Sequence, residues 1–248
     1  MESNNNNPKR DYLVPISILI AGVLIAAAVI YSVGVKGSDN TANKQANVAG
    51  TAVSPLVSPL KLTSGDVVLG DAKAPVTIIV YSDPSCSFCA AAEGYNQQVI
   101  DYLKKGDPSW TPPTPGIIEN YVNTGKAKIV FRYYPGHGSG ELAMKAMFCA
   151  NEQGKFWQLK DKIFANQESV ADLAKIKGFA GEVGVDVSKI TECLDSGKYN
   201  LRLTMDTATG KAAGVSGTPA FFVNNTLIEG ARPFKDFKTV IDQLLTSK

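Results

Sequence analysis

Residues 76–89 read VTIIVYSDPSCSFC, and this stretch decides the fold. Val76 to Tyr81 form a nearly continuous apolar run, which is typical of a strand buried in the centre of a sheet. Cys86 and Cys89 follow soon after, where a helical pattern begins that extends to about Lys105. The stretch therefore predicts a buried strand that passes into a helix through a pair of thiols.

Two thiols at the start of a helix can close a small disulfide ring, and the helix N-terminus stabilises a thiolate through its free N–H groups and dipole. We expect Cys86 to be the more exposed sulfur and the nucleophile, and Cys89, one turn later, to be more buried and to resolve a mixed disulfide. Half of a zinc site and a structural disulfide are the alternatives. Zinc usually takes a second ligand pair, whereas Cys149 and Cys193 lie far apart and His137 is the only histidine. We assign His137 no role.

The remaining elements alternate between strands and helices. The pattern predicts a short helix near 117–123, a strand at 126–133, helices throughout 140–213, strands at 220–223 and 226–229 joined by a turn, and a helix at 233–245. The proline-rich segment 107–116 is predicted to be a loop. This order indicates an α/β fold with a mixed sheet that a helical segment interrupts.

Apolar spacing also predicts which helix faces are buried in the helical segment. One predicted face consists of Ala143, Met147 and Ala150, and a later one of Leu201, Met205, Ala208 and Ala212.

A second chemical signal is Gly217-Thr218-Pro219, just before the strand at 220–223. Proline cannot donate to a sheet ladder, and the residue before it is held extended. If the Thr218–Pro219 bond is cis, the Thr218 backbone would lie beside the dithiol and could pair with an extended substrate segment.

Residues 12–35 carry no charge and are mostly Ile, Leu, Val and Ala. A helix of this length spans roughly 36 Å, enough for a bilayer core of about 30 Å. A cleavable signal peptide is the alternative, but its apolar region usually covers only about 7–15 residues. We expect an uncleaved single-pass anchor, with the short, Asn-rich residues 1–11 in the cytoplasm and the larger body exported.

Residues 36–64 are rich in Ser, Thr, Asn, Ala and Gly and are predicted to be a flexible linker, which leaves 65–248 for one folded domain. The chain of 248 residues has a formal net charge of +2 with its Lys and Arg scattered, so nucleic-acid binding has no support. A single histidine also excludes a metal site built from several His ligands.

Four segments together resemble a known family: VVLGDAKAPVTIIVYSDPSCSFC, CANEQGKFWQLKDKIF, VDVSKITECLDSGKY and GVSGTPAFFVNN. From about Val67 to the C-terminus, the chain resembles the DsbA family of thioredoxin-like thiol:disulfide oxidoreductases, particularly its membrane-anchored bacterial members. The resemblance implies a thioredoxin-like fold with a helical insertion at about 139–205. It implies that Cys86 is the attacking cysteine, Cys89 its partner and Pro219 a cis-proline.

The chain departs from this family at two places. The family often has an acidic residue six positions before the first cysteine, where this chain has Val80. Ser87 and Phe88 stand between the cysteines, without the histidine that would make the disulfide a stronger oxidant. We expect Phe88, with Ser87, Thr218 and Pro219, to support the site and contact substrate.

Cys149 and Cys193 are the remaining cysteines. Our hypothesis is a structural disulfide that braces the insertion, as in some relatives. Two buried free thiols are the alternative, because sequence does not supply Cα separations.

The sequence thus predicts a membrane-tethered thiol:disulfide oxidoreductase, with its catalytic domain on the extracytoplasmic side, that oxidises cysteine pairs of exported proteins. Its only redox group would be the Cys86–Cys89 disulfide, with no separate cofactor and no metal. The resemblance implies reoxidation by a quinone-linked membrane partner. The alternatives are a reductase or isomerase fed by a membrane electron carrier, and a non-catalytic binding or chaperone module.

Overall fold

The computed structural model describes residues 61–136 and 138–247 of the chain. The predicted segments 1–11 and 12–35, nearly all of the predicted linker, and His137 lie outside the described residues. Within those described ranges, no helix has both the length and the apolar character needed to span a bilayer.

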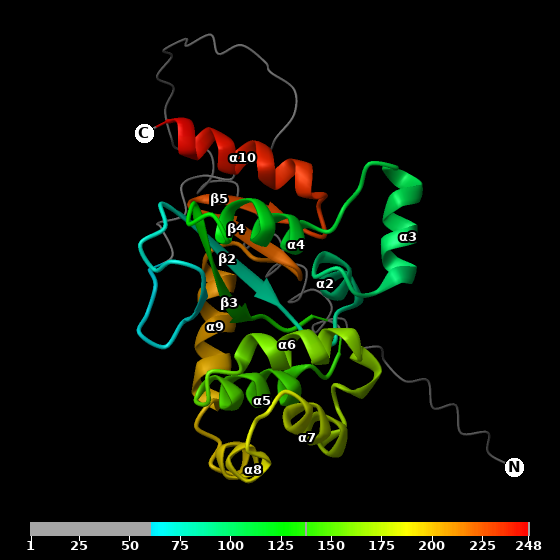
Figure 1. Ribbon diagram of the computed structural model, residues 1–248, viewed down its shortest axis with the longest axis vertical. Coiled ribbons are helices and arrows are strands. Elements are labelled where there is room, and N and C mark those ends of the chain that lie inside the picture. The colour runs from blue at the N-terminus through cyan, green and yellow to red at the C-terminus, as the bar shows by residue number, and fades with distance from the viewer. Residues whose placement is uncertain (1–60, 137, 248) are drawn as a thin grey trace, which may run out of the picture. The chain divides into compact units, whose positions relative to one another are not determined.

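A five-stranded mixed sheet forms the centre of the fold (Figure 1). Its strands are β1 (Val67–Leu69), β2 (Val76–Ser82), β3 (Ala127–Tyr133), β4 (Ala220–Val223) and β5 (Thr226–Glu229). The order is β1-β3-β2-β4-β5; β2 and β3 are parallel, whereas the other neighbours are antiparallel. The apolar run of the opening stretch is therefore the central strand.

Alternate residues of β2 face opposite sides of the sheet. Val76, Ile78 and Val80 enter the larger core, which also contains residues of α2 (Ser87–Ala92) and α10 (Phe234–Thr246). Ile79 and Tyr81 enter a smaller core on the other face. Both faces are covered, which explains why β2 is continuously apolar instead of alternating.

The predicted helix from 86 to 105 is two helices, α2 and α3 (Gln97–Gly106). Gly94 ends α2 with φ of +90°, a conformation that favours glycine, and Asn96 then caps α3 by accepting from the backbone N–H of Val99. The single-helix prediction was wrong because this stop and the start after it lie within four residues, 93–96.

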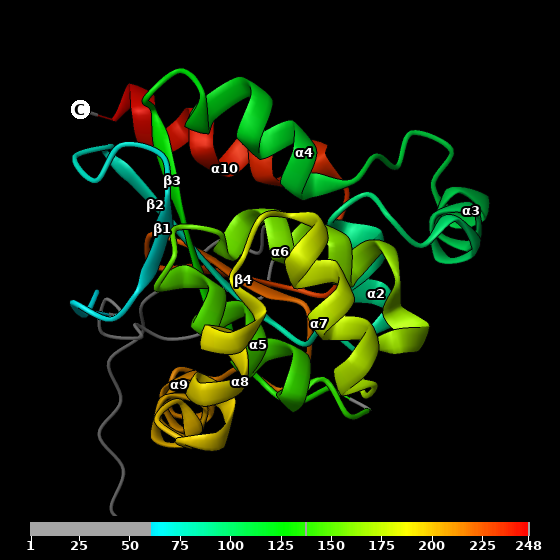
Figure 2. The same ribbon diagram turned by 60° about the horizontal axis from the view of Figure 1, so that its bottom comes forward.

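Two further expectations about elements need correction. The predicted loop 107–116 contains the start of α4 (Pro113–Ile117), because a proline in the first turn of a helix loses no hydrogen bond. The helix continues as a π-helical turn, η1 (Ile118–Val122), and lies beside α10 (Figure 2). The short edge strand β1 was not predicted.

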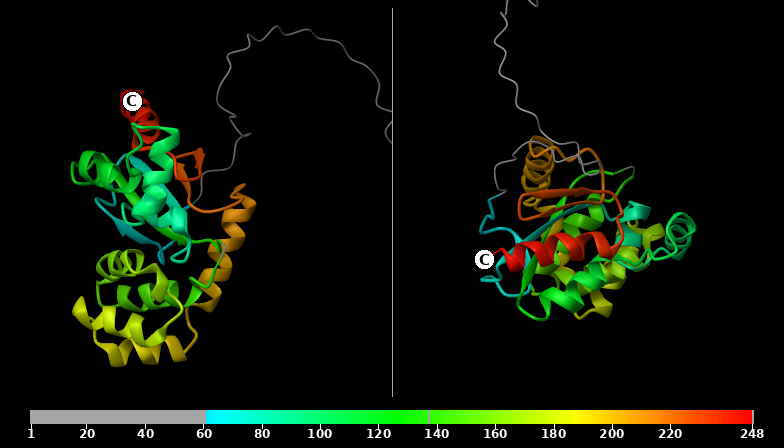
Figure 3. Two further views of the ribbon diagram at one scale, coloured as in Figure 1. Left: turned by 90° about the vertical axis from the view of Figure 1, so that its right-hand side faces the viewer. Right: turned by 90° about the horizontal axis from the view of Figure 1, so that it is seen from above.

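The predicted helical insertion is present. Its helices are α5 (Glu141–Asn151), α6 (Phe156–Ala165), the 3₁₀ turn η2 (Gln167–Ser169), α7 (Leu173–Glu182) and α8 (Val187–Asp195). They lie together as a group, and α9 (Asn200–Ala212) returns from them to the sheet (Figure 3). The thioredoxin-like α/β fold with an inserted helical subdomain is therefore confirmed.

The predicted apolar face of α9 was wrong, because its members are all exposed: Leu201, Met205, Ala208 and Ala212. The buried face instead contains Asp206, which accepts from Arg202 Nε at 2.8 Å and from the Tyr133 backbone N–H at 3.1 Å. It also contains Gly210, where an added Cβ would lie 2.8 Å from the Tyr81 ring. Asp206 is buried because its charge is paired, and Gly210 is buried because its backbone lies against an aromatic ring. The spacing of apolar residues predicts neither kind of burial.

An ion cluster holds the start of the described chain to the sheet and to α9. Arg132 of β3 and Arg202 of α9 each contact the buried Asp66 carboxylate at 2.8 Å. Arg132 also donates to the Lys61 carbonyl at 2.9 Å, and Arg202 donates to the Gly65 carbonyl. Burial acts to raise the pKa of Asp66, but hydrogen bonds and the two guanidinium charges outweigh it, so this pKa is lowered.

Candidate functional site

A tight turn carries the chain from β2 into α2. The Cys86 N–H donates to the Asp83 carbonyl at 3.0 Å, and the Asp83 carboxylate accepts from the backbone N–H and the hydroxyl of Ser85 at 2.8 and 2.7 Å. An aspartate that bonds to the backbone two residues later is typical of turns. The turn places Cys86 at the N-cap of α2.

The two thiols are free in this structure, and both are buried. The Cys86 sulfur accepts from the Cys89 backbone N–H at 3.4 Å, in the position that a serine or aspartate oxygen takes in an ordinary N-cap. Cys86 is 4 % exposed and Cys89 is 1 % exposed. Cys86 is the more exposed of the two, as the sequence predicted, but the difference in exposed fraction is small.

The pKa values of the two thiols differ far more than their exposure. A hydrogen bond with the Cys89 thiol lowers the pKa of Cys86 to about 6, against the opposing effect of burial, and the Cys89 backbone N–H adds to the lowering. Burial, followed by the bond to Cys86 and the charge on it, raises the pKa of Cys89 well above its ordinary value. Near neutral pH the outer sulfur is thus ionised and the inner one protonated.

The loop before β4 lies against Cys86. The Thr218–Pro219 bond is cis, and the Cys86 thiol, when protonated, donates to the Thr218 carbonyl at 3.4 Å. The Thr218 hydroxyl is buried and has no hydrogen-bond partner among the residues that the structure describes. Sequence reasoning placed Thr218 and Pro219 at the dithiol, and the structure brings them there.

A glycine loop after β3 packs on the same turn. The Gly136 N–H donates to the Asp83 carboxylate at 2.6 Å, and a Cβ at Gly136 would lie 2.8 Å from the Thr218 hydroxyl and 3.3 Å from Cys86 Cβ. Only glycine permits this approach. Asp83 therefore joins the loop to the turn that carries Cys86. Sequence reasoning missed this role, although an aspartate directly after a strand and before Pro-Ser is a turn signal.

Ser87 and Phe88, between the two cysteines, face solvent, and Phe88 is 40 % exposed. An exposed aromatic ring beside a buried, ionised sulfur is suited to contact a polypeptide. The position predicted here for substrate contact is thus accessible.

The inner end of α2 has a buried ion pair that sequence reasoning also missed. Glu93, the C-cap of α2, contacts Lys160 of α6, and the Thr114 hydroxyl donates to Glu93 at 3.3 Å. Val80, where the resembling family often has an acid, is 2 % exposed in the larger core. The side chain of Ser82 in β2 acts to lower the pKa of Cys89, against the larger effect of burial.

Cys149 of α5 and Cys193 of α8 form a disulfide, with their Cα atoms 5.9 Å apart. This disulfide joins two helices of the insertion. Among the described residues, no three His, Cys, Asp or Glu side chains gather as a metal site would require.

Comparisons with known proteins agree with this fold. A family model described as thioredoxin matches residues 62–107 and 109–243. The chain is 28 % identical over 177 residues to an Na(+)/H(+) antiporter NhaA of Herminiimonas arsenicoxydans, in a match that covers 71 % of this chain and 25 % of that protein. The chain thus spans about a quarter of the length of that relative.

Two further similarities extend over most of the length of the similar protein. Disulfide bond formation protein D of Bacillus subtilis is 24 % identical, with 74 % of this chain and 79 % of that protein covered. The crystal structure of α-DsbA1 from Wolbachia pipientis superposes with a TM-score of 0.63 at 23 % identity, covering 76 % of this chain and 94 % of that chain. Together with the family model, which spans well over half of the sequence, these similarities place the chain in the thioredoxin family, with the DsbA-like fold.

Proposed function

We propose that this protein is a thiol:disulfide oxidoreductase that oxidises cysteine pairs in other proteins. One observation carries the proposal: the Cys86 sulfur caps the N-terminus of α2, accepting from the Cys89 N–H at 3.4 Å, beside the buried Cys89 thiol. This arrangement lowers the pKa of Cys86 to about 6 and raises the pKa of Cys89. A purely structural pair of cysteines does not require two different pKa values. Thiol exchange requires one sulfur that ionises readily and a second that stays protonated until it reacts. The name of the Bacillus subtilis relative supports the same reaction class.

The reaction begins with a disulfide between Cys86 and Cys89. A substrate thiolate attacks the Cys86 sulfur, the Cys86–Cys89 bond breaks, and Cys89 leaves as a thiolate that takes up a proton. The second substrate thiolate then attacks the substrate's own sulfur in the mixed disulfide, and Cys86 leaves as a thiolate. The substrate loses two electrons, and the dithiol of the protein gains them.

The local geometry supports each role. Cys86 is a good leaving group in the second step because its thiolate is stabilised, and Cys89 takes up a proton once the first step has released it because burial opposes its charge. The Thr218 carbonyl, 3.4 Å from the Cys86 sulfur, precedes the buried Pro219 and can pair with an extended substrate backbone. Phe88 is available for contact with substrate side chains.

A stabilised Cys86 thiolate favours the reduced form of the protein, and this makes the disulfide a stronger oxidant. We therefore propose the oxidising direction over reduction or isomerisation. No separate cofactor enters the scheme. A membrane partner linked to quinone would accept the two electrons and restore the disulfide.

We further propose that residues 12–35 anchor the protein in the cell membrane with the domain outside the cytoplasm. The uncharged, apolar composition of this segment and the oxidising chemistry support the proposal, because disulfides persist outside the cytoplasm. Protease treatment of intact spheroplasts should degrade the domain. Protection of the domain until the cells are lysed would contradict this orientation.

The deciding experiment measures the redox equilibrium of the dithiol against glutathione, with a reduced peptide containing two thiols as substrate. Stoichiometric oxidation of the peptide and a potential well above about −270 mV, the value of thioredoxin, are expected. Turnover only with an added reductant would identify a reductase or isomerase. Peptide binding without any exchange would identify a binding module.

A further inference from the structure

A side chain of the insertion, Gln167 of η2, hydrogen-bonds to the active-site turn. Its Nε2 donates to the carbonyl oxygen of Pro84 at 2.8 Å and to that of Cys86 at 2.9 Å. These two carbonyls flank the turn that carries the nucleophile. Gln167 and the turn are more than 80 residues apart in the sequence, by separations of 83 and 81 positions.

The surroundings determine the orientation of the Gln167 amide. Only the nitrogen can face two carbonyl oxygens, and the opposite Oε1 accepts from Asn96 Nδ2 at 3.5 Å. The Cys86 carbonyl has a second donor, the Ala90 N–H at 3.1 Å. Within the described part of the chain, the carbonyl of the buried Pro84 has only Gln167 as donor.

Loss of this amide would leave a buried carbonyl unpaired and would free the backbone on which the Cys86 sulfur depends. The sulfur accepts from the Cys89 N–H at 3.4 Å, and because hydrogen bonds weaken steeply as their angle departs from linear, a movement of the turn weakens this one. The two N–H groups of Gln167 also offset the negative ends of the carbonyl dipoles near the thiolate.

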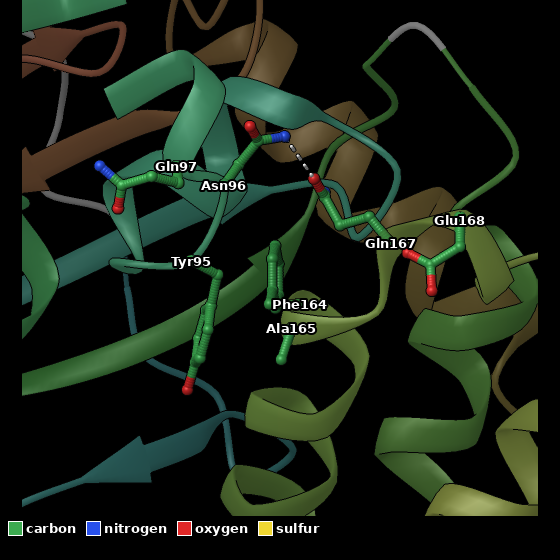
Figure 4. A pocket seen from close by; sticks show the side chains of 7 residues that line it. All are labelled: Tyr95, Asn96, Gln97, Phe164, Ala165, Gln167 and Glu168. Carbon is green, nitrogen blue, oxygen red and sulfur yellow. Dashed lines mark hydrogen bonds between the residues drawn. The ribbon is translucent and has the colours of Figure 1, made fainter. Parts of the chain in front are cut away.

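The side chain of Gln167 lies beside an open pocket and is not enclosed by the core. Gln167 lines this pocket, which has a volume of about 320 Å³. Figure 4 shows its amide directed towards Asn96, with Tyr95 and Phe164 also lining the pocket. A side chain of similar size can therefore replace Gln167 without displacing the core, so substitutions at this position test its hydrogen bonds.

We propose that Gln167 is a positioning residue: it holds the Pro84–Cys86 turn so that the Cys86 sulfur stays at the N-cap of α2. The inference rests on the proposed function, because it assigns Gln167 a role in the same dithiol reaction. The helical insertion thereby acts on the reactivity of a cysteine that belongs to the sheet domain. Asp83 and Cys89, the titratable groups beside Cys86 in the turn and in α2, stay the same in every variant below.

The test compares Gln167→Met with Gln153→Met in the reduced full-length protein. Gln153 is a matched control, because it also lies in the insertion and bonds to backbone, accepting from the Asp186 N–H at 2.9 Å and donating to the Asp186 carbonyl at 3.4 Å. Neither change alters charge. We measure the rate of Cys86 alkylation by iodoacetamide against pH and the redox equilibrium with glutathione.

Gln167→Met should raise the pKa of Cys86 by roughly half a unit or more, slowing alkylation at pH 6 about twofold or more and shifting the equilibrium towards the disulfide. Gln153→Met should change neither quantity. Gln167→Lys, whose ammonium can donate to both carbonyls, should restore or exceed the parent rate. A Gln167→Met protein with the parent pKa and equilibrium overturns the inference.

Two checks keep the result interpretable. If Gln167→Met does not fold, Asn96→Ser is the second variant, because serine still caps α3 but is too short to hold Gln167 Oε1. It must raise the pKa of Cys86 in the same direction, and an unchanged pKa overturns the inference. An ordinary Cys86 pKa in the parent protein would instead contradict the proposed function.

Discussion

The low pKa of Cys86 predicts that the stability of the reduced protein depends on pH in a defined way. Folding lowers this pKa from 9.0 to about 6, so the free energy of unfolding contains a contribution from the thiolate. This contribution is fully present above pH 9 and disappears as the pH falls through 6. At about 1.4 kcal/mol per unit, its limit is about 4 kcal/mol.

Only part of that limit is expressed near neutral pH. The linkage relation gives about 1.4 kcal/mol at pH 7, about 2.7 kcal/mol at pH 8, and almost nothing at pH 5. Since about 1.4 kcal/mol corresponds to 30 mV for a two-electron couple, the pH 7 value makes the disulfide more oxidising by about 30 mV.

The assay is urea unfolding of the reduced protein and of Cys86→Ser, each at pH 5, 7 and 8. Serine keeps the N-cap oxygen but does not ionise, so the difference in unfolding free energy between the two proteins isolates the thiolate. This difference should increase by about 1.3 kcal/mol from pH 5 to 7 and by about the same amount again from pH 7 to 8. A difference that stays constant across this range would refute the reasoning, because Cys86 would then titrate alike in the folded and unfolded chains.

Other substitutions test the remaining parts of the structure. Cys89→Ala removes the thiol donor, so the pKa of the outer cysteine should rise from about 6, and after attack of Cys86 on a substrate that carries a disulfide the mixed disulfide should accumulate on non-reducing gels; absence of both effects would exclude the resolving role. Lys160→Met leaves the Glu93 carboxylate buried without its cation, so chemical unfolding should show a loss of about 3–5 kcal/mol, and a loss below 1 would contradict the pairing. Serine at both Cys149 and Cys193 should lower stability by about 2–4 kcal/mol but leave the rate of peptide oxidation unchanged; a slower rate would mean that the disulfide also supports the site.

Local signals were sufficient to predict the centre of the fold. The apolar run of β2, the spacing of Cys86 and Cys89, and the proline before β4 each depend on a short segment. The hairpin of β4 and β5 was predicted with the observed bounds, because its strands and turn are contiguous. Fold class and the dithiol therefore follow from the sequence.

Contacts between distant segments could not be predicted. Asp83 receives the Gly136 N–H, 53 positions away, and Glu93 pairs with Lys160, 67 positions away. Gln167 reaches the turn over a longer separation still. No local pattern distinguishes these residues from other polar ones, because burial and partner decide their roles. The buried face of α9 was missed for the same reason, because Asp206 on that face accepts from the Tyr133 backbone N–H, 73 positions away.

The ion cluster around Asp66 has a mechanical consequence. A pull on the chain upstream of Lys61 meets the guanidinium groups of Arg132 and Arg202 before it reaches β1. Force therefore passes into β3 and α9, and the short edge strand, which has only three residues to resist peeling, carries little of it. Arg132 lies opposite Tyr81 in the pairing of β2 with β3 and donates to the Tyr81 hydroxyl at 3.3 Å. Tension on the leading segment would therefore also reach the end of β2 from which the Cys86 turn departs.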